Sequence, residues 1–419
     1  MILSFIFTWL LSAMLANPAH AATFTVNSRY DLNDLSPGNG LCVAYLVINP
    51  PFVLPFCTLR AAIEESNSLP GQDTIILSGG TYQLDLDGAG EDISATGDLD
   101  IIDSLVIVGA GPENTFIDGG GLDRVLDIIE SNITVTISGI TITNGFLPVN
   151  LQTNQKGGGG IRNAGTLSFK NSSIINNHVQ GLADEDTGGG LFNIGTCSII
   201  NSTIRNNSAK QGGGVVNENG ATLQISESTI CSNNAERGGG IINYGSITAT
   251  NTTFSSNIAD TGNYPVGGAI QNWNECTLIH STIAENIAPL GGGGISNDGT
   301  LSMVNTIVSD NAGGDCRLVR SIDSKGYNIA SDHSCYLSRA LGDLENTEPL
   351  LGPLQDNGGV TPTHALSQNS PAIDAGILLA NVSIDQRGIK RPQRETSDIG
   401  AYEIEPISIV PFISPLLLK

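Results

Sequence analysis

The chain has 419 residues, of which 51 are glycine, 41 are aspartate or glutamate and 18 are lysine or arginine. Its formal net charge of −23 excludes a nucleic-acid partner, because phosphate groups are bound by clusters of lysine and arginine. Charged residues make up only 14% of the chain and hydrophobic residues 40%, which excludes an intrinsically disordered protein.

The first segment is typical of an export signal. An apolar stretch from Ile2 to Ala16 precedes Asn17-Pro18 and the small-x-small sequence Ala19-His20-Ala21. This is the order of a hydrophobic region, a breaker and a cleavage site, so we predict a signal peptide over residues 1–21 and a secreted or cell-surface protein. No other apolar segment reaches the ~20 residues that span a bilayer, and we expect no transmembrane span in the mature chain.

Residues 22–70 are predicted to form an N-terminal cap. The segment Thr23–Val26 alternates like a strand. Farther on, residues 59–67 place their apolar side chains on one helical face, behind Thr58 as N-cap and ahead of Pro70-Gly71. Such a helix can cover the open end of the sheet structure that follows, because exposed strand edges promote aggregation.

The densest run of acidic residues follows this cap. Carboxylates at alternate positions with glycine turns can gather oxygen ligands around Ca²⁺, although the spacing is not that of an EF-hand loop. A solvated acidic turn is the alternative interpretation. The candidate calcium ligands are Asp85, Asp87, Glu91, Asp92, Asp98 and Asp100.

A repeat of about 24 to 30 residues fills the middle of the chain. Each copy contains two or three glycines and ends on asparagine, as in Gly158–Asn163, and a second signature such as Asn171–Asn177 ends on another asparagine. Short β-branched strands between glycine and asparagine at this period are typical of stacked coils and are too short for helices. We predict an all-β, right-handed parallel β-helix with its coils over residues 71–345.

The asparagines that recur once per coil are predicted to be structural turn residues. Asparagine tolerates the left-handed backbone region, and asparagine side chains stacked about 4.8 Å apart can form hydrogen-bonded ladders. The first set is Asn163, Asn193, Asn217, Asn243, Asn272 and Asn297, and the second is Asn177, Asn207, Asn233, Asn257, Asn286 and Asn311.

The seven cysteines divide into two kinds. Cys42 and Cys57 flank a loop in the cap, and Cys316 and Cys335 flank another loop near the end of the coils. Both pairs are predicted to be local disulfides, since export permits them. The remaining cysteines lie inside repeats and are expected to be buried fillers: Cys197, Cys231 and Cys276.

Residues 346–405 carry short motifs of another kind: Gly352-Pro353-Leu354, Asp356–Gly359, Thr363–Leu366, Ser370–Asp374, Asp385–Gly388 and Asp398–Glu403. They are similar to the domain called choice-of-anchor Q. Cys57–Ala62 resembles the Cys-Ser-Leu-Arg-Glu-Ala motif of exported bacterial β-helix proteins, and departs from it at Thr58 and Ala61. The resemblance implies architecture and export and implies no activity, because a fold alone supplies none. The short apolar tail, residues 406–419, stands where that family carries a sorting or anchoring segment.

Three functions are compatible with these features. The leading interpretation is a monomeric structural or adhesive module, since serine, threonine and asparagine repeated along a solenoid suit weak multivalent binding to glycans or surfaces. A calcium-dependent polysaccharide lyase or epimerase is the first alternative, with Ca²⁺ and Arg162, Arg205 or Arg237 neutralising a uronate. A passenger-like outer-membrane protein is the second.

His364, Asp374 and Arg387 could suggest a catalytic triad within residues 346–405. No nucleophile stands beside them in the sequence. A triad needs a nucleophile within hydrogen-bond reach of its base. We therefore expect these three residues to be structural.

Overall fold

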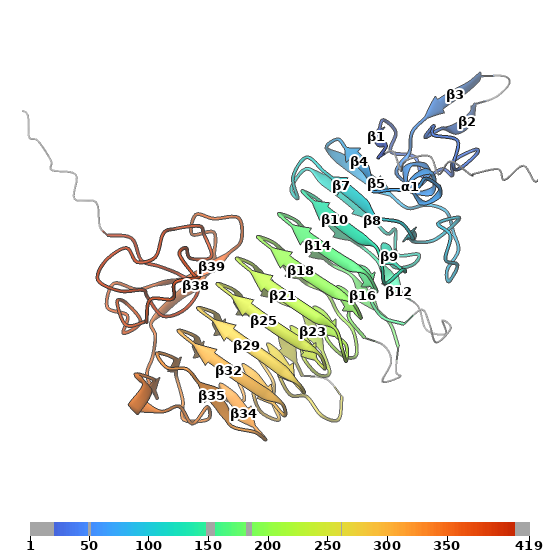
Figure 1. The fold of residues 1–419 in the computed structure, drawn as a ribbon. Coiled ribbons are helices and arrows are strands. Elements are labelled where there is room, and N and C mark those ends of the chain that lie inside the picture. Colours follow the sequence, from blue (N-terminus) through green and yellow to red (C-terminus); the bar gives the residue numbers. More distant parts are fainter. Residues whose placement is uncertain (1–20, 49–51, 148–155, 182–186, 261, 407–419) are drawn as a thin grey trace, which may run out of the picture.

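The computed structural model describes residues 21–48, 52–147, 156–181, 187–260 and 262–406, and Figure 1 shows their arrangement. The predicted signal peptide, except for its last residue, and the apolar tail beyond residue 406 lie outside this range. Within it, short strands stack coil upon coil into an elongated solenoid (Figure 1). None of the described helices is long and apolar enough to cross a membrane.

Three parallel sheets run the length of the solenoid. Sheet 1 contains β1 (Thr23–Val26), β4 (Asp73–Leu77), β7 (Leu105–Val108), β10 (Thr134–Ser138), β14 (Thr166–Lys170), β18 (Thr196–Ile200), β21 (Thr222–Ser226), β25 (Ser246–Thr250), β29 (Glu275–Ile279), β32 (Thr300–Val304) and β35 (Ile322–Ser324). Sheet 2 contains β5 (Gly80–Gln83), β8 (Thr115–Asp118), β11 (Thr141–Thr143), β15 (Ser173–Ile175), β19 (Thr203–Arg205), β22 (Thr229–Cys231), β26 (Thr253–Ser255), β30 (Thr282–Ala284), β33 (Ile307–Ser309), β36 (Ile329–Ala330) and β37 (Leu344–Glu345). Sheet 3 contains β6 (Leu99–Ile101), β9 (Leu126–Ile128), β13 (Ile161–Asn163), β17 (Leu191–Asn193), β20 (Val215–Asn217), β24 (Ile241–Asn243), β28 (Ile270–Asn272), β31 (Ile295–Asn297) and β34 (Cys316–Leu318).

Small two-stranded sheets complete the described strands. Two are parallel and join neighbouring coils: β12 (Phe146–Leu147) with β16 (His178–Val179), and β23 (Asn234–Ala235) with β27 (Ile258–Ala259). The other two are antiparallel and lie outside the coils: β2 (Ala44–Ile48) with β3 (Phe52–Phe56), and β38 (Leu351–Gln355) with β39 (Thr363–Leu366). A 3-10 turn, η1, spans Arg339–Leu341.

Side chains alternate between inward and outward positions along the strands, and the inward ones form the core. Strand β14 buries Leu167 and Phe169 and leaves Thr166 and Lys170 exposed. Because neighbouring coils pair in register, like residues stack above one another, as in the interior row that runs from Ile142 on sheet 2 into the next coils. Burial of such branched side chains is the main stabilising term for the coils. The predicted all-β parallel β-helix is confirmed.

The recurrent asparagines form two ladders inside the solenoid. In each ladder the Nδ2 group of one asparagine donates to the Oδ1 atom of its counterpart in the next coil, at 2.7 to 2.9 Å from Asn163 to Asn297. The second ladder, from Asn177 to Asn311, has distances of 2.9 to 3.1 Å. Nearly all of these side chains are fully buried, so each ladder satisfies amide groups that would otherwise be costly inside a protein.

The prediction that these asparagines adopt the left-handed backbone region is wrong. The left-handed residues are others, immediately before the second ladder position and at the corner between sheets 1 and 2, such as Asn176 and Asn171. Several coils place other residue types at these corners, including Glu227 and His280. A ladder asparagine is selected for its side-chain amide, whereas the corner residue needs only to tolerate positive φ.

The glycine triplets mark the corner that leads into sheet 3. Gly188 has φ +66°, which favours glycine. At Gly189 a Cβ atom would lie only 2.5 Å from the carbonyl oxygen of Gly213 in the next coil. The triplet is therefore required by a turn and by close packing of adjacent backbones.

The predicted capping helix is present as α1 (Leu59–Ser68), and Thr58 Oγ1 accepts a hydrogen bond from Ala61 N at its start. The helix packs against β1, β4 and β6 at the first coil. Its buried surface extends beyond the predicted apolar face to Arg60 and Glu65, because the chain before it also folds over the helix. The predicted disulfides Cys42–Cys57 and Cys316–Cys335 are both formed.

Residues 346–406, which we call the C-terminal unit, do not continue the stacked coils. The strands β38 and β39 form an antiparallel hairpin, and the rest of the unit is irregular. The chain turns back, so that the unit lies along the second half of the solenoid (Figure 1). Hydrogen bonds that span more than 100 residues attach it to sheet 2.

Candidate functional site

The outer surface of sheet 2 is the part of the molecule that the C-terminal unit shapes. In register, the first residues of its strands form an outward row of hydroxyl groups: Thr141, Ser173, Thr203, Thr229, Thr253 and Thr282. We call this set the hydroxyl row. It crosses from the coils that the C-terminal unit covers to coils that it leaves open.

The covered half of the hydroxyl row holds the C-terminal unit. Thr229 Oγ1 donates to the carbonyl oxygen of Pro362 at 2.6 Å, and Thr253 Oγ1 donates to Gln386 Oε1 at 2.6 Å. Thr282 Oγ1 accepts a hydrogen bond from Ala401 N at 3.0 Å. In each of three successive coils, one hydroxyl of the row is therefore hydrogen-bonded to the C-terminal unit.

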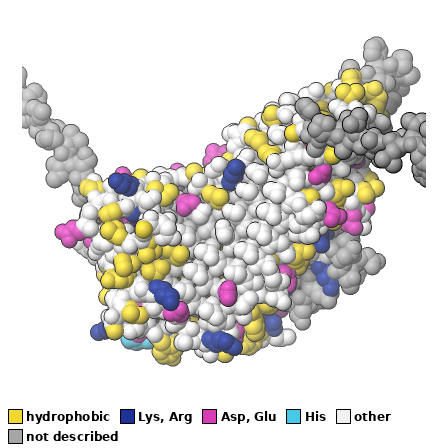
Figure 2. All heavy atoms as spheres, viewed as in Figure 1, with side chains coloured by type: hydrophobic (Ala, Val, Ile, Leu, Met, Phe, Trp, Pro, Cys, Tyr) yellow, Lys and Arg dark blue, Asp and Glu magenta, His cyan; other side chains and the backbone are white. Residues whose placement is uncertain are grey.

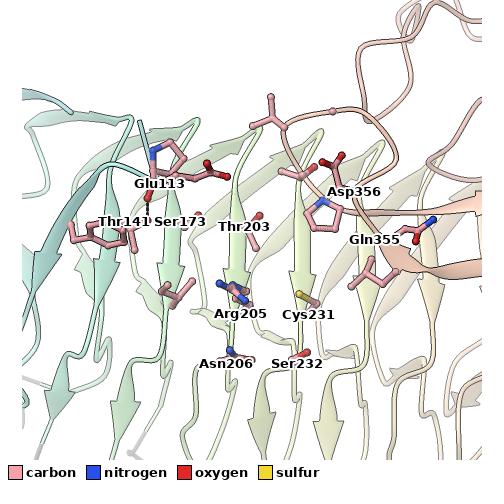
Figure 3. A pocket seen from close by; sticks show the side chains of 18 residues that line it. Glu113, Thr141, Ser173, Thr203, Arg205, Asn206, Cys231, Ser232, Gln355 and Asp356 are labelled. Atoms are coloured by element: carbon pink, nitrogen blue, oxygen red, sulfur yellow. Dashed lines mark hydrogen bonds between the residues drawn. The ribbon is translucent and has the colours of Figure 1, made fainter. Parts of the chain in front are cut away.

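The open half of the row lines a groove of about 690 Å³. Its floor carries Ser173 and Thr203, beside the buried Thr141, whose hydroxyl donates to Pro112 O at 2.6 Å. One wall is the C-terminal unit with Gln355 and Asp356 (Figure 3). The exposed Glu113 stands at the opposite end. The groove crosses several coils, which suits an extended ligand better than a compact one.

Arg205 is the one cationic side chain among the described residues that line this groove. It lies on β19 beside Cys231 and above Asn206 in the view of Figure 3. No described residue forms an ion pair or side-chain hydrogen bond with its guanidinium group, which is exposed. Burial raises the pKa of the Cys231 thiol to about 11, so this thiol is protonated at neutral pH.

The other two arginines considered for uronate binding lie elsewhere. Arg162 Nη1 forms an ion pair with Asp127 Oδ1 at 2.8 Å on sheet 3. The Arg237 guanidinium lies over the ring of Tyr264, 5.4 Å from its centroid. The structure therefore does not bring Arg162, Arg205 and Arg237 together.

A second group of charged residues lies at the first coils of sheet 3, under the cap. We call Asp92, Asp98, Asp100, Asp123 and Asp127 the acidic centre. One carboxylate oxygen from each of Asp92, Asp100 and Asp127 lies within 4.8 Å of the other two. Among the described residues, this is the only group of three or more acidic, histidine or cysteine side chains with such a spacing.

Only part of the predicted calcium set belongs to this trio. Asp92 and Asp100 do, whereas Asp85 and Asp87 are exposed and lie outside it. Asp98 lies outside it as well and pairs with Arg124, whose Nε atom is 2.8 Å from Asp98 Oδ2. Glu91 uses its two oxygens to accept backbone hydrogen bonds from Thr96 and Ile93 within its own loop.

Asp127, Asp123 and Arg124 were not predicted from the sequence to belong to this site. A signal was present, since the tripeptide Leu-Asp-Ile occurs at residues 99–101 and again at residues 126–128. These tripeptides are β6 and β9, which pair with Asp100 opposite Asp127. Burial, and then the nearby carboxylates, raise the pKa of Asp100 to about 8.

The three residues of the suggested triad have separate structural partners. His364 contacts Gly352 O through Nδ1 at 2.7 Å and Ser255 Oγ through Nε2 at 2.9 Å. Asp374 Oδ1 accepts a hydrogen bond from Glu395 N, and Arg387 pairs with Asp385 at 2.8 Å. Their contacts hold the C-terminal unit together and attach it to sheet 2.

The face formed by sheet 1 carries scattered charges and is dominated by uncharged atoms (Figure 2). Its outward residues include Thr196 and Ser198 in one coil and Thr222 in the next. Cys197 and Cys276 lie on the inward side of this sheet and are buried, and Cys231 is buried on sheet 2. None of these three cysteines is disulfide-bonded.

No family model and no curated protein matches the chain. Among solved structures, the chain is similar to the pectate lyase Pel9A, with 17% sequence identity over 79% of this chain and 88% of that one, at a TM-score of 0.40. Two crystal structures of the pectin methylesterase from Aspergillus niger are similar at 13% and 12% identity, over 68% of this chain and 92% of that one, at a TM-score of 0.31. Similarity at this level carries no argument about activity, and the resemblance to exported bacterial β-helix proteins stays a prediction.

Proposed function

We propose that the chain is a secreted β-helix protein that binds an extended, hydroxyl-rich polysaccharide along the groove on sheet 2. The observation that carries this proposal is the continuity of the hydroxyl row. In the covered coils the row binds the C-terminal unit, and in the open coils it forms the floor of a groove.

The covered half supports the proposal because it demonstrates the chemistry of the row. The Thr229 hydroxyl donates a hydrogen bond to a carbonyl oxygen, and the Thr282 hydroxyl accepts one from a backbone N–H group. A hydroxyl group can do both. Ser173 and Thr203 offer the same groups to a ligand that carries donors and acceptors at regular intervals, which is the character of a polysaccharide.

The charges of the groove favour a ligand with few acidic groups. Arg205 is placed to bind one carboxylate or sulfate, whereas Glu113 and Asp356 at the two ends repel a uniformly anionic chain. An open groove of this kind yields modest affinity at a single site. Attachment to a surface would then depend on many copies or many sites, which is the adhesive role expected from the sequence.

A lyase is the weaker proposal for this groove. Removal of an α-proton needs a base beside the neutralised carboxylate. Arg162 and Arg237, which would assist Arg205 in that role, are engaged outside the groove. We therefore favour binding over elimination.

The test is affinity electrophoresis of the purified chain in gels that contain neutral or uronate-bearing polysaccharides. Arg205→Ala should weaken binding of a uronate-bearing ligand about tenfold, since a hydrogen bond to a charged group is worth about 1.5–3 kcal/mol. Thr203→Val should weaken binding about fivefold, since a neutral hydrogen bond is worth about 1 kcal/mol.

Matched controls make the same chemical changes outside the groove. Lys170→Ala removes one exposed positive charge, and Thr196→Val removes one exposed hydroxyl, both on sheet 1. Equal losses in the control and groove variants, or no retardation by any polysaccharide, would refute the proposed site. An enzyme-dependent rise in absorbance from unsaturated products would favour the lyase instead.

A further inference from the structure

The acidic centre contains a pairing that β-sheets normally avoid. Asp100 on β6 and Asp127 on β9 are in-register neighbours in adjacent parallel strands. Like charges directly opposite each other destabilise a sheet. Arg162 continues the same outward row on β13 and pairs with Asp127.

The neighbouring cations compensate Asp127 and Asp98. Arg124 Nη1 lies 3.6 Å from Asp127 Oδ2, and Arg124 Nε lies 2.8 Å from Asp98 Oδ2. Asp100 stands at the end of its row, since β6 is the first strand of sheet 3. No described residue forms an ion pair with it within 4.0 Å.

Asp100 also has an unpartnered oxygen. Its Oδ2 atom accepts a hydrogen bond from Ser94 N at 2.7 Å, but its buried Oδ1 atom has no hydrogen-bond partner among the described residues. The residue is 0% exposed. A buried carboxylate oxygen without a donor, beside two further carboxylates, is an arrangement that a bound cation would satisfy.

We propose that Asp92, Asp100 and Asp127 bind one Ca²⁺ ion, which ties the 84–98 loop to the first two strands of sheet 3. Ca²⁺ takes oxygen ligands at about 2.3–2.6 Å, so two ligands on opposite sides of it are about 4.6–5.2 Å apart. The three carboxylate oxygens lie within 4.8 Å of one another, which is within that span. Mg²⁺ usually keeps several of its waters and takes only one or two protein carboxylates, so a set of three carboxylates favours Ca²⁺.

The loop that supplies Asp92 is already held in place from the other side. The Arg60 guanidinium group donates to the carbonyl oxygens of Ser94, Gly97 and Asp98 at 2.8 to 3.0 Å. The ion would therefore complete a preformed site and join the cap to the coils. This inference does not depend on the groove on sheet 2.

The experiment uses the full purified chain, freed of metal with a chelator, in equilibrium dialysis against CaCl₂ and in thermal melting. We expect one Ca²⁺ per chain and a melting temperature that rises by about 3 °C at a hundredfold excess over the Kd. Asp100→Asn keeps the shape of the side chain and should weaken binding by roughly tenfold or more, because it removes one ligand charge. The double variant Asp85→Asn/Asp87→Asn is the matched control in the same loop and should bind as the parent chain does.

The proposal would be overturned if the chain showed no saturable Ca²⁺ binding or bound Mg²⁺ with equal affinity. An unchanged Kd in Asp100→Asn, or a loss of binding in the control variant, would also overturn it. If Asp100→Asn does not fold, Asp92→Asn changes an exposed loop residue and provides the same test. Its Kd should also rise, and an unchanged value would count against the site.

Discussion

The connection between the cap and the first coils can be tested at Arg60. This arginine is 0% exposed, and its guanidinium group makes five hydrogen bonds, two to the carboxylate of Asp31 and three to backbone carbonyls of the 84–98 loop. Arg60→Met retains an unbranched apolar stem and removes every one of these donors. We expect a large loss of stability that is confined to the cap.

The magnitude follows from what remains after the change. Asp31 stays buried without its ion-pair partner, and removal of one partner from a buried pair costs about 3–5 kcal/mol. Asp31 Oδ2 keeps hydrogen bonds from Asp85 N and Leu86 N, which places the expected loss near the lower end, at about 3 kcal/mol. Arg60→Lys should recover only part of this loss, because a lysine cannot reach both carboxylate oxygens and three carbonyls at once.

Native-state hydrogen exchange is the appropriate assay, because solenoids can open locally. Amides of α1 and of the 84–98 loop should exchange faster in Arg60→Met, while those of β18 and β21 should stay as protected as in the parent chain. Arg394→Met, at an exposed arginine, is the control. Unchanged exchange in the cap, or equal acceleration across all coils, would refute the reasoning that Arg60 joins the cap to the loop.

Three further predictions concern other parts of the chain. Stability should fall as pH rises from about 4 to about 6: burial raises the pKa of Asp398 from 3.8 to about 6, so the folded protein retains a proton that the unfolded chain releases. This group contributes about 3 kcal/mol, which is the amount by which the pH-dependent loss in urea unfolding should differ between the parent chain and Asp398→Asn. Asn233→Ala should lower stability by about 2–5 kcal/mol in urea unfolding, because it removes the side-chain donor to Ile204 O and the side-chain acceptor of Asn207 N, whereas exposed Asn219→Ala should have little effect. Thiol reagents should modify Cys197 only after unfolding, since burial raises the pKa of its thiol to about 12.

The sequence was sufficient to predict the solenoid because every coil repeats the same physical requirements. Glycine is needed where backbones of adjacent coils nearly touch, as at Gly189, and asparagine is needed where an amide bonds to its counterpart. Residues with such strict requirements leave a periodic signal. The capping helix was predictable for a similar reason, since Thr58 and the apolar face of the helix are local features.

The corner residues and the acidic centre were harder to predict for different reasons. A corner with positive φ accepts Asn171, Glu227 or His280, so the backbone requirement leaves no single residue type to recognise. The acidic centre combines a loop with two strands, and Asp127 lies one full coil beyond Asp100. A search along a continuous acidic run selects neighbours in sequence, such as Asp85, instead of neighbours across the stack.

The position of the groove on sheet 2 could not be predicted from the repeats, because the C-terminal unit determines where the groove begins. Ser173 and Thr229 occupy equivalent positions two coils apart, yet only Thr229 is bonded to the C-terminal unit. If the unit docked one coil nearer the N-terminus, it would cover Thr203 and shorten the open row. The length of the open groove is therefore set by contacts such as that of His364 with Ser255, which join residues 109 positions apart. If the groove binds an extended polysaccharide as proposed, a change where the C-terminal unit contacts sheet 2 would alter the preferred ligand length without changing a residue of the groove floor.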